Sequence, residues 1–212
     1  MTIRWFIFIV SALALVVPLP AFYSRKRRYR TLHALDIERR NGSRWLMLTH
    51  ILRFAGHWIE LARGLLASLG VLATIDVLRN VSPFFAAHAA WARFVLPLVL
   101  AILCVSLIAL LFRYPGKSLA PIPFLTATLL VLVPLPVSIP ALLLALTWGA
   151  AIRSLAAFFL ALPPALALLG LLLDRRLWPS LAGAVLALVP GAIAFARHQE
   201  FVIPVRRPVS GG

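Results

Sequence analysis

Long apolar stretches alternate with short polar connections along most of this chain. Runs of fifteen to twenty residues with almost no charge recur between Ile3 and Ala196, and short arginine-bearing connections separate them. A helix of about 20 apolar residues matches the ~30 Å hydrocarbon core of a bilayer, and a helix satisfies its own backbone hydrogen bonds there. The pattern therefore predicts an all-α fold, a polytopic transmembrane helix bundle.

We expect about seven spans in a single integral membrane domain that covers residues 1–212. The fifth expected span is only about 22 Å long as a helix. Prolines also interrupt the stretch from Leu119 to Ile152, and proline kinks or ends a helix because it lacks a backbone donor. Six spans with one re-entrant segment are the alternative. Pro163 and Pro164 predict a kink or two half-helices in the sixth. The seven segments are 5–23, 58–78, 94–112, 119–136, 138–152, 155–173 and 178–196.

The composition supports a membrane protein. Hydrophobic residues make up 62% of the chain and charged residues 13%, and the mean hydropathy is +0.98. A water-soluble domain of this length needs many more polar residues to cover its surface. This balance argues against a soluble globular protein.

The positions of the positive charges predict an orientation. The net charge is +15, with 21 Lys and Arg against six acids, and positive residues in short loops stay on the cytoplasmic side. The basic loop 24–44 is therefore expected in the cytoplasm and the N-terminus outside. With seven spans the short tail 197–212 is also cytoplasmic, and the positive residues divide sixteen inside to five outside. We interpret the chain as a multi-pass protein of a bacterial-type inner membrane, and the first segment as a retained helix rather than a cleaved signal.

Five basic residues directly after the first apolar run are expected to bind lipid headgroups. Each basic residue near a membrane surface contributes about 1 kcal/mol of attraction to anionic lipids. Nucleic acid is disfavoured as a partner because interleaved aromatic stacking platforms are missing. The headgroup-binding residues are Arg25, Lys26, Arg27, Arg28 and Arg30.

Small residues recur every three or four positions in the last expected span. Ala184, Ala187, Gly191 and Ala194 would lie along one helix face. Small residues allow close helix approach inside a bilayer, where the hydrophobic effect supplies no drive for association. This face is predicted to pack against another helix, either of the same chain or of a partner subunit.

A polar stripe is expected before and within the second span. Ser43 is expected to cap its start, and a continuous helix from Ser43 to Leu78 would be about 54 Å long, more than the bilayer core. Its first half is expected to be an amphipathic helix in the cytoplasmic interface that bends near Gly56 or Gly64, or else to project inward and pack on other helices. In the interfacial case, Arg53 and Arg63 reach headgroups and Glu60 pairs with Arg63.

The same stripe holds the candidate cofactor residues, His50 and His57. Ionisable residues at membrane depth are costly and are often functional. The two histidines are about 10.5 Å apart along a helix axis, which is too far for one metal ion, and we predict no metal site. A tetrapyrrole or a quinone bound by His50 or His57 is the possible cofactor.

No catalytic or nucleotide-binding signature is present in the sequence. The leading hypothesis is a non-catalytic membrane protein that serves as an accessory, structural or assembly subunit of a larger complex, with other membrane subunits or a second copy as partners. A small transporter or channel component is the first alternative, because proline-broken helices around residues 121–164 could line a path. A haem-, quinone- or pigment-binding subunit that uses the His50 and His57 helix is the second.

Overall fold

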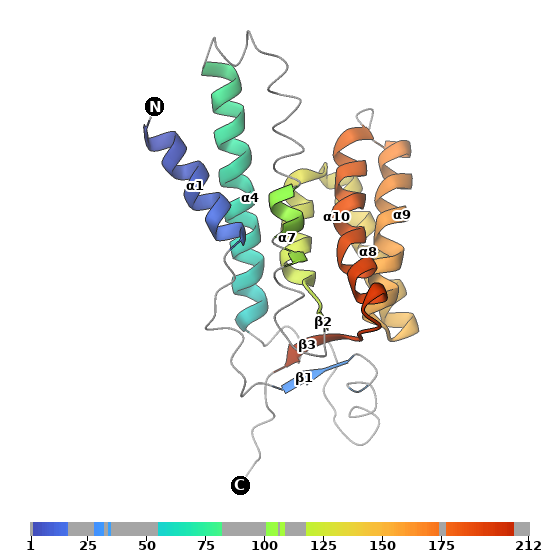
Figure 1. Cartoon of the computed structure of the whole chain (residues 1–212). Coiled ribbons are helices and arrows are strands. Elements are labelled where there is room, and N and C mark those ends of the chain that lie inside the picture. The colour runs from blue at the N-terminus through green and yellow to red at the C-terminus, as the bar shows by residue number, and fades with distance from the viewer. Residues whose placement is uncertain are drawn as a thin grey trace.

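The computed structural model describes residues 2–16, 28–31, 34, 55–81, 101–105, 107–108, 118–173 and 177–205. These residues are mostly helical, and the helices stand side by side with a small sheet below one end (Figure 1). Residues 101–105 and 107–108 are also helical. The longer helices are α1 (Thr2–Val16), α4 (Ala55–Val81), α7 (Ile122–Leu132), α8 (Leu135–Ile152), α9 (Leu155–Leu173) and α10 (Leu177–Ala196).

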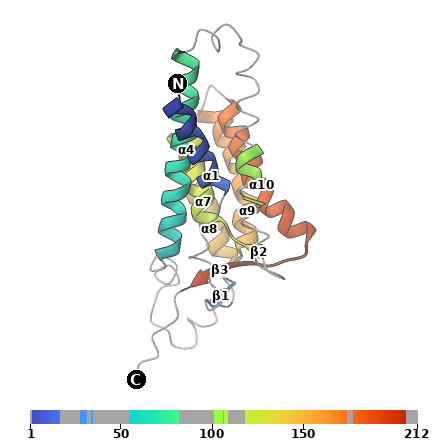
Figure 2. The ribbon, with the colours of Figure 1, turned by 60° about the vertical axis from the view of Figure 1, so that its left-hand side comes forward.

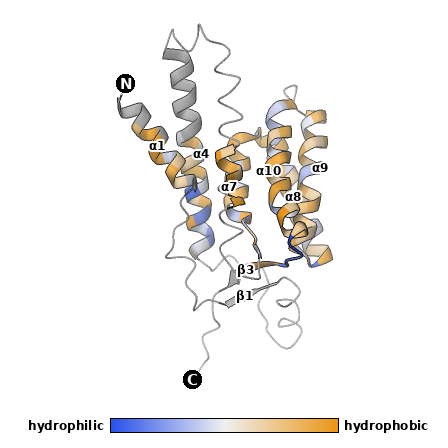
Figure 3. Ribbon diagram, viewed as in Figure 1, coloured by the Kyte–Doolittle hydropathy of each residue, from blue (hydrophilic) through white to orange (hydrophobic). Residues whose placement is uncertain are grey.

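Three of these helices are long and apolar enough to cross a membrane. They are α8, α9 and α10, with 18, 19 and 20 residues. Apolar residues dominate all three helices in the hydropathy view (Figure 3). The predicted class, a helical protein with membrane-spanning segments, is supported at this level. The other predicted spans fall on α1, α4 and α7 or extend outside the described residues.

The predicted span 119–136 is wrong in its limits. Strand β2 (Ser118–Leu119) precedes α7, which has only 11 residues and is about 17 Å long at the standard rise. Val133 is extended, with φ −108° and ψ 136°, because the residue before a proline avoids helical angles. Pro134 is the N-cap of α8, so the helix break lies before this proline. Helix α8 therefore begins at Leu135, whereas the predicted span 119–136 had included Leu135 and Pro136.

Two positions where a bend or break was expected lie inside continuous helices. Helix α4 continues past Gly64, and α9 contains Pro163 and Pro164 as one helix rather than two half-helices. The expected helix start at Ser43, with Arg53, lies outside the described residues. From Ala55 onward, α4 packs on α1 and α7, and the choice between an interfacial and an inward-projecting first half stays a prediction.

A three-stranded sheet was not predicted, and it corrects the all-α expectation. Strand β3 (Phe201–Val205) lies in the centre, with β1 (Arg28–Arg30) antiparallel on one side and β2 parallel on the other. The strands come from the predicted basic loop, the connection before α7 and the predicted tail. All three connections therefore meet at one end of the bundle, as both ribbon views show (Figure 2).

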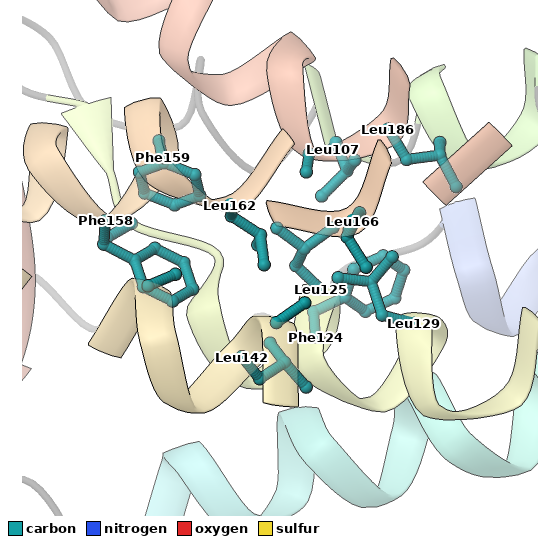
Figure 4. Packing of buried hydrophobic residues seen from close by; sticks show 14 of the residues in the cluster. Leu107, Phe124, Leu125, Leu129, Leu142, Phe158, Phe159, Leu162, Leu166 and Leu186 are labelled. Atoms are coloured by element: carbon teal, nitrogen blue, oxygen red, sulfur yellow. The ribbon is translucent and has the colours of Figure 1, made fainter. Parts of the chain in front are cut away.

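The apolar core joins the two halves of the bundle. Helix α1 packs on α4 and α4 on α7, while α9 packs on both α8 and α10. Phe124 of α7 and Phe158 and Phe159 of α9 are fully buried, and the two α9 rings meet edge to face with their centroids 5.0 Å apart. Leucines from α7, α9 and α10 fill the space between these rings (Figure 4).

Candidate functional site

Helix α4 contains a buried ion pair between Glu60 and Arg63. Nε and Nη2 of Arg63 donate to Oε2 of Glu60 over 2.9 and 2.6 Å. The residues are three apart on the helix, and only 5% of Glu60 and 8% of Arg63 is exposed. The predicted pairing is confirmed. The expectation that Arg63 reaches lipid headgroups is wrong, because its guanidinium lies inside the bundle.

Arg63 joins three helices. Its Nη1 donates to the backbone carbonyl of Ala14 in α1 over 2.8 Å, and its guanidinium carbon lies 4.8 Å from the centroid of the Phe124 ring in α7. The Ala14 carbonyl belongs to the last turn of α1, where carbonyls have no partner within the helix and carry partial negative charge. The arginine therefore serves as a cap for α1 and as a cation on an aromatic face of α7.

Glycine permits the close approach that encloses this pair. A methyl group at Gly64 would lie 3.0 Å from the Phe124 carbonyl oxygen and 3.1 Å from Cβ of Ala127. A methyl group at Gly70, on the same helix, would collide with the Ser11 side chain of α1. Gly64 therefore has a packing role, since only a residue without a side chain leaves room for α7.

One oxygen of the ion pair has no partner. Oε1 of Glu60 is buried without a hydrogen bond, which is unusual for a charged atom. His57 lies one helical turn earlier and is half-buried, whereas His50 lies outside the described residues. The described part of the chain holds no group of three His, Cys, Asp or Glu side chains that could bind a metal ion. A cofactor at His50 or His57 stays a prediction.

The small residues of α10 lie between helices of the same chain. Ala187 and Ala194 are buried, while Ala184 and Gly191 are half-buried. A methyl group at Gly191 would lie 3.4 Å from Cβ of Phe159 in α9. For these residues, the structure therefore favours an internal helix over a partner subunit as the packing partner.

The predicted headgroup-binding cluster is described only in part. Arg28 and Arg30 belong to strand β1, which pairs with β3 at the sheet end of the bundle. Arg25, Lys26 and Arg27 lie outside the described residues. The described arginines thus occupy the same end of the protein as the tail that was predicted to be cytoplasmic.

A cavity of about 800 Å³ at this end was not predicted. Arg153 and His198 border it, and each follows an apolar helix closely in the sequence. A basic residue just after an apolar helix was the only feature of the sequence that could have indicated this site. The sequence does not show that the two turns border the same cavity. The lining residues are Thr31, residues 153–156, Phe159, Leu160, Leu188, Gly191, Ala192, Ala194, Phe195 and residues 198–201.

Comparison with known proteins gives no match. No protein-family model, no curated protein and no solved structure is similar to this chain at a significant level. The functional argument therefore depends on the residues and contacts described above.

Proposed function

We propose that the protein is a non-catalytic integral membrane protein that acts by packing, as an accessory, structural or assembly subunit of a larger membrane complex. Several of its interior polar groups bond within the chain, whereas the buried hydroxyls of Ser68, Ser138 and Ser180 have no hydrogen-bond partner among the described residues. Arg63 bonds to Glu60 and Ala14, and the Thr128 hydroxyl donates to the Phe124 carbonyl. Large apolar side chains cover much of the outside of α8, α9 and α10. Such a surface can pack against other membrane helices, but it presents few polar groups that could bind or react with a substrate.

The observation that supports a partner most directly is the outer stripe of α10. Leu181, Val185, Leu188, Ala192 and Phe195 follow one another at intervals of four, three, four and three residues, and all are exposed. This spacing places them along one helix face, as in the seam of a coiled coil. On the neighbouring face, Gly191 approaches Phe159 of α9, and Leu188, Ala192 and Phe195 of the stripe also border a cavity. Leu181 and Val185 are therefore the part of the outer stripe available to another subunit or to a second copy.

Site-specific photo-crosslinking in native membranes tests this proposal. A photoreactive side chain at Val185 should give a protein adduct of defined mass, because Val185 is 56% exposed on the outer stripe. The matched control is the neighbouring Leu186, which is fully buried and should crosslink only within the chain. Adducts to lipid alone from Val185, together with purification as a stable isolated monomer, would refute the subunit role.

We also propose seven crossings of a bacterial inner membrane with the N-terminus outside. The support is that the turn after α8, all three strands and the end of α10 lie together at one end (Figure 1). If the chain crosses seven times and the basic loop is inside, the connections after the third and fifth spans and the tail must also be inside. These are the segments that lie together at this end. Crossings by α1, α4, α7 and the segment around residues 101–108 belong to the proposal.

Cysteine labelling in intact cells tests the orientation. Cys104 is the only cysteine and is replaced by alanine first. An impermeant maleimide should then label Arg175→Cys, between α9 and α10, but Thr31→Cys only after the cells are opened. Labelling of Thr31→Cys in intact cells, with Arg175→Cys protected, would reverse the orientation.

The cofactor alternative has one specific observation in its favour, the unpartnered Glu60 oxygen one turn from His57. A haem or pigment band that is lost in His57→Ala would support it, and a spectrum without such a band removes the tetrapyrrole version. The transporter alternative has less support. Thr147 donates to the Leu144 carbonyl of its own helix, and aromatic and leucine side chains fill the space between α7 and α9 (Figure 4).

A further inference from the structure

The cavity at the sheet end has one polar end and apolar walls. Phe159 of α9 and Leu188 and Phe195 of α10 form part of the walls, while Arg153 and His198 lie at the polar end. Its volume of about 800 Å³ falls within the range of roughly 300–1,000 Å³ that is common for ligand sites. Such a cavity fits a molecule that is itself part polar and part apolar.

The two basic residues occupy an unusual backbone conformation. Arg153 has φ 57° and His198 has φ 51°, in the left-handed region where glycine is the ordinary residue at the end of a helix. Arg153 ends α8 with its amide bonded to the Ala150 carbonyl, and the His198 amide bonds to the Phe195 carbonyl in the last turn of α10. Glycine would form both turns with less strain, so the basic side chains point to a role of their own.

The polar end has groups that can bind an anion. Arg153 supplies a positive charge and His198 an imidazole N–H donor, beside one acid, Glu200, and Arg197 adjoins His198 in the sequence. Helix α9 starts at Leu155 beside them, and the first amides of a helix lack internal partners and carry partial positive charge. Carbonyls in the last turns of α8 and α10 accept hydrogen bonds from backbone amides of the two turns, so part of their opposing charge is compensated.

The apolar part of the cavity opens toward the surroundings of the bundle. Its floor contains Phe159, whose ring centroid lies 4.6 Å from that of Phe201 in β3. Ala192 is small and exposed, so it leaves the groove between α9 and α10 unfilled. Leu160 and Phe195 at the mouth are 70% and 82% exposed. A hydrocarbon chain could therefore enter sideways from a bilayer that surrounds these two helices.

We propose that this cavity binds one membrane lipid with an anionic, phosphate-bearing headgroup. The phosphate would contact Arg153 and His198 at the level where α8 and α10 end. One acyl chain would lie in the groove between α9 and α10, over Ala192. This site is separate from the basic loop 24–44, and it does not depend on the subunit role proposed above.

The preference for an anionic headgroup is tested on the whole protein in mild detergent, with an equimolar mixture of phosphatidylglycerol and phosphatidylcholine. Native mass spectrometry should show one retained lipid, with phosphatidylglycerol preferred about fivefold because of the Arg153 charge. Arg153→Gly combined with His198→Gly should remove this preference and leave thermal stability intact, because glycine suits both backbone conformations. Arg175→Gly, which lies between α9 and α10 in the sequence, is the control and should keep the preference.

The apolar groove is tested with a filling substitution. Ala192→Trp should reduce the retained lipid of both kinds at least severalfold, whereas Val185→Trp, seven residues earlier on the same face and outside the cavity, should not. Excess inorganic phosphate should leave the bound lipid in place. Displacement by phosphate would show a site for small anions instead, and an unchanged preference in the double glycine variant or unchanged retention in Ala192→Trp would overturn the proposal.

Discussion

The two halves of the bundle are held together by different means. Helices α1, α4 and α7 meet around Arg63, which binds a carboxylate, a backbone carbonyl and an aromatic face. Helices α8, α9 and α10 meet through apolar side chains and small residues, such as Gly170 of α9 against Ser180 of α10. A bilayer supplies no hydrophobic drive between helices, so polar bonds and close packing are the means available. In this protein the polar bonds centre on Arg63 in the first half, whereas close packing occurs in both halves, at Gly64 and Gly70 as well as at Gly170.

The difference has an energetic consequence. A buried ion pair is strongly destabilised when one partner is removed, because the other charge stays buried without compensation. Apolar packing is sensitive to changes in side-chain volume, and the loss of stability depends on how well the neighbouring side chains can adjust. The first half should therefore respond to changes of charge as well as of shape, and the second mainly to changes of shape.

The largest expected effect is that of Glu60→Ala. Arg63 would remain buried without its carboxylate, and the free energy of unfolding should fall by about 3–5 kcal/mol. Unfolding of the purified protein in mixed micelles, followed by circular dichroism against added denaturing detergent, measures this change.

Removal of both charges is the matched control for that substitution. Glu60→Leu combined with Arg63→Met has similar bulk and leaves no buried charge, so most of the lost stability should return, as it does in other buried pairs. Arg63→Lys should not substitute for arginine, because a lysine cannot make the same set of directed bonds to Glu60 and Ala14. If Glu60→Ala and the double substitution lowered the free energy of unfolding equally, the explanation by an uncompensated buried charge would be wrong.

A smaller effect is expected for Gly170→Ala in the second half. The added methyl group would collide with Cβ of Ser180, and overpacking of this kind costs about 1–3 kcal/mol. The comparison variant is Gly191→Ala, whose methyl group would lie 3.4 Å from Cβ of Phe159 and should be nearly neutral. The same unfolding measurement applies, and a larger loss for Gly191→Ala than for Gly170→Ala would reject the packing explanation.

Much of the second half could be predicted from sequence, because its helices are long, apolar and free of charge. The segments expected at 155–173 and 178–196 agree with α9 and α10 within one residue. The break before α8 was misplaced, since three prolines between residues 134 and 140 offer several positions for it. Only the structure shows that Pro134 lies outside the helix and Pro140 within it.

The sites were harder to predict than the helices. The spacing of Glu60 and Arg63 indicates a pair on one helix face, but the burial of that pair depends on α1 and α7, which lie far away in the sequence. Arg153 and His198 are separated by most of α9 and α10, so their common cavity appears only when both helices are in place. The sheet was missed because β2 has only two residues and β3 contains Pro204, which weakens any strand pattern.

The position of β3 has a consequence for biosynthesis. The ribosome releases β1 before α4, whereas the segment that hydrogen-bonds to it follows α10. Pairing of β1 must therefore wait until α10 is complete, and the sheet would form only after the helices have inserted into the membrane. A nascent chain arrested before Phe201 would leave β1 and β2 without their shared neighbour, exposed to chaperones and proteases at the membrane surface.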